Sequence, residues 1–292
     1  MSDFILLPGE FRILERLRLN LSRSFSGRVR GERLTAKRGL SIEFSDYREY
    51  AEGDDLRHLD WNVLARLDTP IMKTYRDEED LAVHLLIDAS SSMSFGEPSK
   101  FEQAKRLAAA IAYVALCGGD ALYPATLGLR TPPIQGLRNR TSFQRFAAWC
   151  SSHQPEGNAG LAASAKAFAS SSARAGLCIL LTDGFDPEIA QGIRILTGRG
   201  HEVNLLQVLS DIELDPDIEG DLRLIDAESG EAVEITANAP TLREYRKRLE
   251  VHNKELEAEV LRSGGKYAQV NAKTPLDIAV RDILIKKGWV KS

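Results

Sequence analysis

The chain has 292 residues, of which 43% are hydrophobic and 27% charged, as in a globular protein with one large domain or one domain and an appendage. Its net charge of −4 gives no bulk attraction for nucleic acid, and its three well-separated cysteines exclude a disulfide framework. No apolar run reaches the roughly 18 residues that a membrane span needs, and the N-terminus lacks a signal-peptide pattern, so we expect a cytoplasmic protein.

The first predicted element is a basic helix over residues 9–24. Its apolar residues Phe11, Leu14 and Leu17 fall on one face. Such a helix can lie on a membrane surface, but acidic residues dilute its charge, and docking onto the protein's own body is the preferred interpretation. We expect residues 1–80 to form an N-terminal helical and β extension that packs on the main domain.

From residue 81 onward, predicted strands alternate with predicted helices. The strands are expected at 81–88, 120–127, 176–183, 201–210 and 267–270, and the helices at 100–116, 142–150, 161–168, 187–198, 241–262 and 275–287. A β-hairpin is inserted at about 222–235, where apolar residues alternate around a Ser-Gly pair. This order predicts an α/β domain over 81–292 with a doubly wound, mostly parallel sheet of the Rossmann type.

Two of the predicted strands are continuous apolar runs that end in an aspartate, Asp88 in one and Asp183 in the other. Strands buried on both faces have this pattern. In open α/β sheets, ligands bind beyond the carboxyl ends of the strands, where the strand order reverses. If these two strands are neighbours, both carboxylates face one crevice.

The residues after the first of these strands offer oxygen ligands. Asp88, Ser90 and Ser92 alternate along an extended turn, so one carboxylate and two hydroxyls can converge on one point. Mg²⁺ prefers such hard oxygen donors and needs only one or two carboxylates in addition to water. Asp183 would add a carboxylate, directly or through water. The alternative is that the two serines only satisfy backbone groups of the loop and the helix terminus.

Other chemistries lack their motifs. The chain contains no GxSxG elbow, no GxxxxGK[ST] loop and no GxGxxG turn, and its five histidines show no metal-ligand spacing. His84 lies within a buried strand and is expected to be a core residue. We therefore predict no catalytic residue and no nucleotide cofactor. The remaining enzymatic hypothesis is a metal-dependent hydrolase in which Asp88 and Asp183 hold the ion and Asp186 is the base.

Two motifs carry a family resemblance. Asp88-Ala89-Ser90-Ser91-Ser92-Met93, together with Thr182-Asp183-Gly184, resembles the metal ion-dependent adhesion site of von Willebrand factor type A domains. Upstream, the spaced residues Tyr47-Arg48-Glu49-Tyr50, Gly53-Asp54-Asp55, Asp60-Trp61 and Ala65-Arg66 resemble the signature of the bacterial family called domain of unknown function fifty-eight.

The resemblance implies a non-enzymatic adaptor that works with a MoxR-type AAA+ ATPase, or with its client, in protein maturation or complex assembly. It implies Mg²⁺, or Mn²⁺, at Asp88, Ser90, Ser92 and Asp183, with a partner's carboxylate completing the coordination. The chain departs from the pattern at Ala159, where such domains supply a threonine. Either the amide oxygen of the adjacent Asn158 replaces that ligand, or the site has one ligand fewer and has decayed to a structural role.

The upstream signature also has an interpretation from its charges alone. Its ionic residues alternate in sign over a short span, which predicts an ion-pair network that fixes this region to the main domain, with Trp61 as a packing anchor. A partner-docking surface is the alternative. The ionic residues are Arg48, Asp54, Asp55, Arg57, Asp60 and Arg66.

Overall fold

The computed structural model describes residues 5–22, 43–51, 54–76, 81–129, 134, 136–156, 160–171, 174–227 and 230–291. The chain forms two compact units, one made of Met1–Phe25 with Leu81–Ser292 and the other of Ser26–Asp80. The first of these units contains the sheet.

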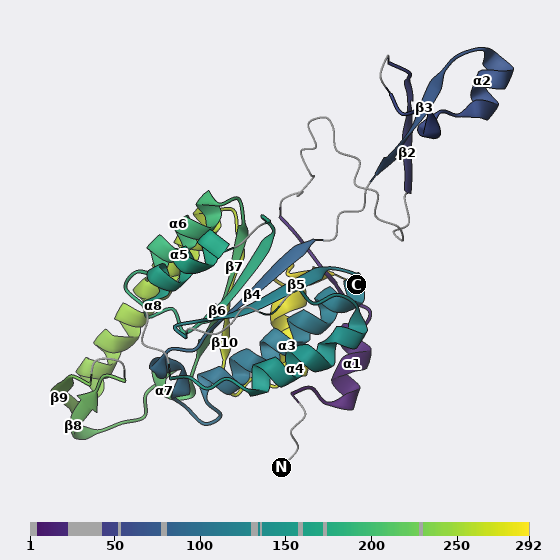
Figure 1. Ribbon diagram of the computed structural model, residues 1–292. Helices are drawn as coiled ribbons and strands as arrows, with labels where there is room; N and C mark the ends of the chain where they lie inside the picture. Colours follow the sequence, from purple (N-terminus) through teal and green to yellow (C-terminus); the bar gives the residue numbers. More distant parts are fainter. Residues whose placement is uncertain are drawn as a thin grey trace. The chain divides into compact units, whose positions relative to one another are not determined.

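The main unit is built on a five-stranded sheet in which every pairing is parallel (Figure 1). The strand order is β10-β7-β6-β4-β5. The strands are β4 (Ala82–Asp88), β5 (Ala121–Leu127), β6 (Leu177–Thr182), β7 (Glu202–Leu209) and β10 (Tyr267–Asn271). Pro124 lies in β5, an edge strand, where a missing backbone N–H is tolerated.

Helices cover both faces of this sheet, which confirms the doubly wound α/β fold. Successive residues of a strand point to opposite faces, so Leu85 and Ile87 join one core and Leu86 joins the other. Residues of α1 (Pro8–Leu14), α3 (Lys100–Gly118), α4 (Phe143–Ser151), α9 (Leu276–Ile278) and the π-helical η4 (Ala279–Ile285) pack in the first core. Residues of α5 (Leu161–Ser171), α6 (Ile189–Gly198) and α8 (Ala239–Arg262) pack in the second.

The N-terminal segment docks on the main unit's own body, as expected, although its helix is shorter than predicted. Leu14 and Leu17 are buried, and the ring of Phe11 packs edge-on against Tyr113 of α3. The helix ends at Leu14 because the chain then forms β1 (Arg18–Leu19), which pairs with β11 (Val290–Lys291).

The predicted hairpin is present as an isolated two-stranded ribbon of β8 (Gly220–Ile225) and β9 (Ala232–Ala237). The long helix that follows starts two residues earlier than predicted. Asn238 caps it by accepting a hydrogen bond from the backbone N–H of Thr241. In the part of the chain that the structure describes, no helix combines the length and the apolar character needed to cross a bilayer.

The second unit contains the antiparallel strands β2 (Glu43–Glu49) and β3 (Ile71–Arg76), with η1 (Leu56–His58) and α2 (Trp61–Leu67) between them. Three ion pairs of this signature region form within the unit: Arg48–Asp54 at 2.6 Å, Arg57–Asp55 at 2.6 Å and Lys73–Asp60 at 3.0 Å. Asp60 also caps α2. These bonds give the signature charges a local structural role. Within its own unit, Trp61 is not a buried anchor, since 60% of its surface is exposed.

Candidate functional site

The two strands that end in aspartate are neighbours in the sheet. Residues 83–87 of β4 pair in parallel with residues 177–181 of β6, so Asp88 and Asp183 leave the sheet at the same edge. The chain order reverses here, because β5 lies on one side of β4 and β6 on the other. The two strands are therefore neighbours at the point where ligands bind in open α/β sheets.

Asp88 is held rigidly at this edge. One of its carboxylate oxygens accepts the backbone N–H of Ser90 at 2.9 Å, and the other accepts the hydroxyl of Thr182 at 2.6 Å. Only 6% of Asp88 is exposed. Burial raises the pKa of Asp88 to about 6, and the nearby charge of Asp183 adds to this increase, against the hydrogen bonds that lower it.

The two predicted serines meet beside Asp88. The Oγ atoms of Ser90 and Ser92 lie 3.1 Å apart, and the Ser92 hydroxyl donates to Oδ2 of Asp183 at 2.8 Å. In this described loop, Ser90 precedes the 3₁₀ turn η2 (Ser91–Ser94) without capping it. The serine side chains therefore belong to a cluster of polar side chains. The alternative, that they only satisfy backbone groups, does not account for these contacts.

A residue that the sequence analysis did not identify lies directly behind this cluster. The ammonium group of Lys100 donates to Oδ2 of Asp183 at 2.7 Å and to Oε1 of Glu213 at 2.5 Å, with only 1% of the lysine exposed. The other oxygen of Glu213 accepts both the backbone N–H and the hydroxyl of Ser210, which caps α7 (Asp211–Leu214). Lys100 thus connects the start of α3 with the loops that follow β6 and β7.

The sequence contains one signal for this contact. Lys100 is the first residue of α3, where the partial positive charge of the helix N-terminus disfavours a cation. A buried lysine at that position requires carboxylates close by. Glu213 carried no signal of its own, because it lies 113 residues away and serves locally as a capping residue.

The loop after β6 has little conformational freedom. Gly184 adopts a φ of +79°, and a Cβ there would lie 2.7 Å from a methyl group of Leu256. The backbone carbonyl of Asp183 accepts a hydrogen bond from the side chain of Gln207, and that of Gly184 accepts one from His252. The backbone that presents Asp183 is therefore fixed from several directions.

The donor atoms of this edge fit a hard divalent cation. Asp88, Ser90 and Ser92 supply only oxygen atoms, and the two serines are half-exposed, so water can complete an octahedron. Among the described residues, no group of three or more His, Cys, Asp or Glu side chains is placed to hold a metal, so such an ion would depend on the hydroxyls. Asn158 and Ala159, the expected third-loop positions, lie outside the described residues.

Two further predicted residues have structural roles. The carboxylate of Asp186, the base of the hydrolase hypothesis, accepts the backbone N–H groups of Leu161 and Glu188, both at 2.6 Å. His84 is a core residue, as expected: its Nε2 lies 3.0 Å from the carbonyl oxygen of Arg174. Burial lowers the pKa of His84 to about 4, although this hydrogen bond raises it.

Sequence comparison finds relatives across most of the chain. A model of the family described as "Protein of unknown function DUF58" matches residues 46–255. The chain is 31% identical over 244 residues to the uncharacterized proteins Rv1480 of Mycobacterium tuberculosis and Mb1516 of Mycobacterium bovis, and the alignment covers 79% of this chain and 74% of each relative.

Structure comparison finds similar chains at low sequence identity. The conserved hypothetical protein BatB from Bacteroides thetaiotaomicron matches with a TM-score of 0.41 and 16% identity, over 71% of this chain and 98% of that one. An aerotolerance-related membrane protein from Bacteroides fragilis matches with a TM-score of 0.41 and 20% identity, over 70% and 99%.

Proposed function

The chain belongs to the DUF58 family, and from the geometry of its site we propose that it is a non-enzymatic protein-interaction module whose partner binding uses a divalent cation at Asp88, Ser90 and Ser92. The observation that carries this proposal is the convergence of the two serine hydroxyls, 3.1 Å apart, beside a carboxylate that burial and two hydrogen bonds hold in place. Hard oxygen donors in this arrangement suit Mg²⁺ or Mn²⁺.

Different residues of this site position the ligands and leave them open to a partner. Thr182 and the backbone of Ser90 fix the carboxylate of Asp88, while Asp183 orients the hydroxyl of Ser92 by accepting a hydrogen bond from it. Ser90 and Ser92 remain partly open to solvent, so a partner can reach them. A bound divalent cation would supply positive charge with open coordination positions for a carboxylate of the partner.

The resemblance to von Willebrand factor type A domains supports a protein partner. For this family it suggests a MoxR-type AAA+ ATPase, or the client of such an ATPase, and a role in protein maturation or complex assembly. The absence of catalysis is likewise a proposal. It is supported by the contacts of Asp186, whose carboxylate is occupied by two backbone N–H groups and so is a poor general base.

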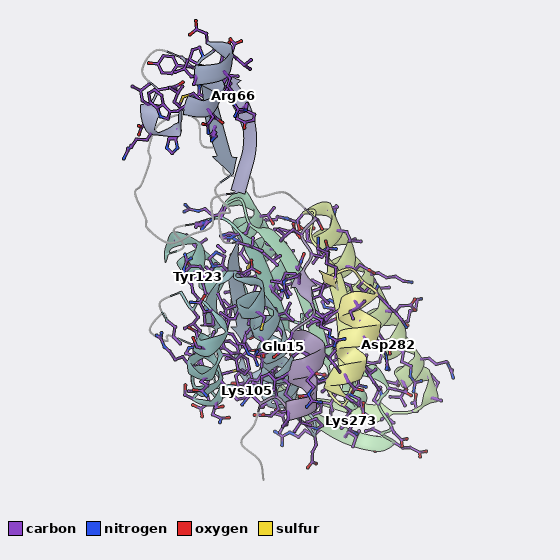
Figure 2. All side chains as sticks on the ribbon, turned by 90° about the vertical axis from the view of Figure 1, so that its right-hand side faces the viewer. Glu15, Arg66, Lys105, Tyr123, Lys273 and Asp282 are labelled. Carbon is purple, nitrogen blue, oxygen red and sulfur yellow. The ribbon has the colours of Figure 1, made fainter. Side chains whose placement is uncertain are left out.

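A pull-down with a purified MoxR-type ATPase from the same organism, in Mg²⁺ or in EDTA, tests this function. We expect the wild-type chain to bind in Mg²⁺ and to lose binding in EDTA, and Asp88→Ala to bind in neither. Asp282→Ala is the matched control, because Asp282, labelled in Figure 2, is a carboxylate of η4 that pairs locally with Lys286. Equal capture of wild type and Asp88→Ala in Mg²⁺ would show that the cation is not involved.

A further inference from the structure

Lys100 places a positive charge inside the candidate site. Its ammonium group contacts Asp183 at 2.7 Å and Glu213 at 2.5 Å. We infer that Lys100 is a counter-ion that competes with the divalent cation for Asp183. This competition limits the affinity of the site for the cation. The inference rests on the proposed function, which places a divalent cation at this site. Asp183 is then a positioning residue for Ser92 rather than a direct ligand.

The hydrogen bonds of Asp183 support this division. Its Oδ2 atom already accepts from both Lys100 and Ser92, and its Oδ1 atom accepts the backbone N–H of Phe185 at 3.2 Å. A divalent cation bound to Asp183 as well as to Ser92 would lie against the ammonium group. Two like charges so close in a buried setting repel strongly, so the ion is expected to stay on the side of Asp88.

Lys100 has little room to move away. Only 1% of its side chain is exposed, and its Nζ atom lies over the Phe185 ring, 5.6 Å from the ring centroid. A second carboxylate, Glu213, holds the ammonium group from the other side, and that carboxylate is fixed by Ser210. Moving the lysine would leave the buried carboxylate of Asp183 without an ion-pair partner, which costs more than the pair itself contributes.

The balance of charges at the site also supports the role of Lys100 as a counter-ion. Asp88, Asp183 and Glu213 bring three carboxylates to this edge, and Lys100 is the cation that forms ion pairs with two of them. Removing its charge makes the surroundings of the site more negative by one unit and removes one of the two hydrogen bonds that Oδ2 of Asp183 accepts. Both changes increase the attraction for a divalent cation.

Lys100 also contributes to the packing of the segments around the site. It ties the start of α3 to the loops after β6 and β7 by two ion pairs. In the wild-type chain, thermal stability should therefore depend less on Mn²⁺ than in a chain without this ammonium group. Without the ammonium group, a divalent cation would have to balance the same carboxylates, and stability should become dependent on the metal.

The test is a Mn²⁺ titration of the full chain, followed by calorimetry, for the wild type and three variants. Lys100→Met removes the charge at similar length, and Lys100→Arg retains it. Lys105→Met is the matched control, because Lys105, labelled in Figure 2, is a buried lysine of the same helix whose partner is Glu102. Circular dichroism checks that each variant is folded.

We expect Lys100→Met to bind Mn²⁺ about tenfold more tightly than the wild type, with Lys100→Arg and Lys105→Met within about threefold of it. Its melting temperature should also rise when Mn²⁺ is added, by more than that of the wild type. A folded Lys100→Met variant whose affinity for Mn²⁺ is unchanged or weaker overturns the inference about Lys100 but not the proposed cation site. Binding by Lys100→Met but not by the wild type supports the inference and overturns the proposed function. No binding by any of the proteins overturns both.

If Lys100→Met does not fold, Glu213→Gln provides the test. This change retains the Lys100–Asp183 pair and removes the other carboxylate that holds the ammonium group. The lysine should then compete harder for Asp183, and Mn²⁺ affinity should fall by about threefold or more. Wild-type affinity in Glu213→Gln would contradict the inference.

Discussion

His84 makes the stability of the main unit depend on pH. Its ring is buried between Tyr123, Phe168 and His201, and burial lowers its pKa from 6.5 to about 4. The unfolded chain therefore binds a proton near pH 6.5 that the folded chain does not. Stability that is present above this pH is lost as the pH falls, until the folded ring also takes up a proton near pH 4.

The size of this effect follows from the two pKa values. A difference of 2.5 between 6.5 and about 4 corresponds to about 3.4 kcal/mol at full extent, and to about 2 kcal/mol at pH 5. Asp88 acts in the opposite direction, because burial raises its pKa. Comparison with a variant that lacks only the histidine isolates the contribution of His84.

The variant is His84→Phe, which keeps an aromatic ring but cannot take up a proton. Urea unfolding at pH 7.5 and at pH 5 gives the free energy of unfolding of both proteins. The variant is expected to be less stable at pH 7.5, because it lacks the hydrogen bond to the carbonyl of Arg174. Between the two pH values, the wild type should lose about 2 kcal/mol more than the variant. Equal losses would refute the reasoning.

Two further predictions concern the loops of the site. Gly184→Ala should lower the free energy of unfolding by about 2 kcal/mol or more, because the positive φ and a contact of 2.7 Å with Leu256 both oppose a Cβ. Urea unfolding measures this change, and an unchanged unfolding midpoint would contradict the prediction. Thr182→Val should weaken Mn²⁺ binding in a calorimetric titration, because Asp88 loses the hydroxyl that orients it. Wild-type affinity in this variant would mean that Thr182 does not position the carboxylate.

The architecture of the main unit was predictable because its strands are buried on both faces. Such strands must be continuous apolar runs, and β4 and β6 show this pattern up to the aspartates that end them. Their adjacency stayed a condition at the level of sequence, because chain order alone does not say which strands pair. Predictions from local sequence patterns were wrong where contacts with distant segments of the chain determine the local structure. The N-terminal helix ends early because Arg18 and Leu19 pair with the last strand of the chain.

The site was predictable only in part, for a related reason. Asp88, Ser90 and Ser92 lie close together in sequence, and the ends of neighbouring strands bring Asp183 to them. The ion pair between Lys100 and Glu213 depends on how the loops after different strands meet, and local patterning holds little information about such a contact. The unfavourable position of a lysine at a helix N-terminus was the one available signal.

The central claim is that the edge formed by Asp88, Ser90 and Ser92 binds a divalent cation. Calorimetric titration of Mg²⁺ and of Mn²⁺ into the wild-type chain and into Asp88→Ala tests it most directly. About one ion is expected to bind per wild-type chain, and none to Asp88→Ala. Flat titrations of the wild type with both ions, or equal binding by the variant, would contradict it.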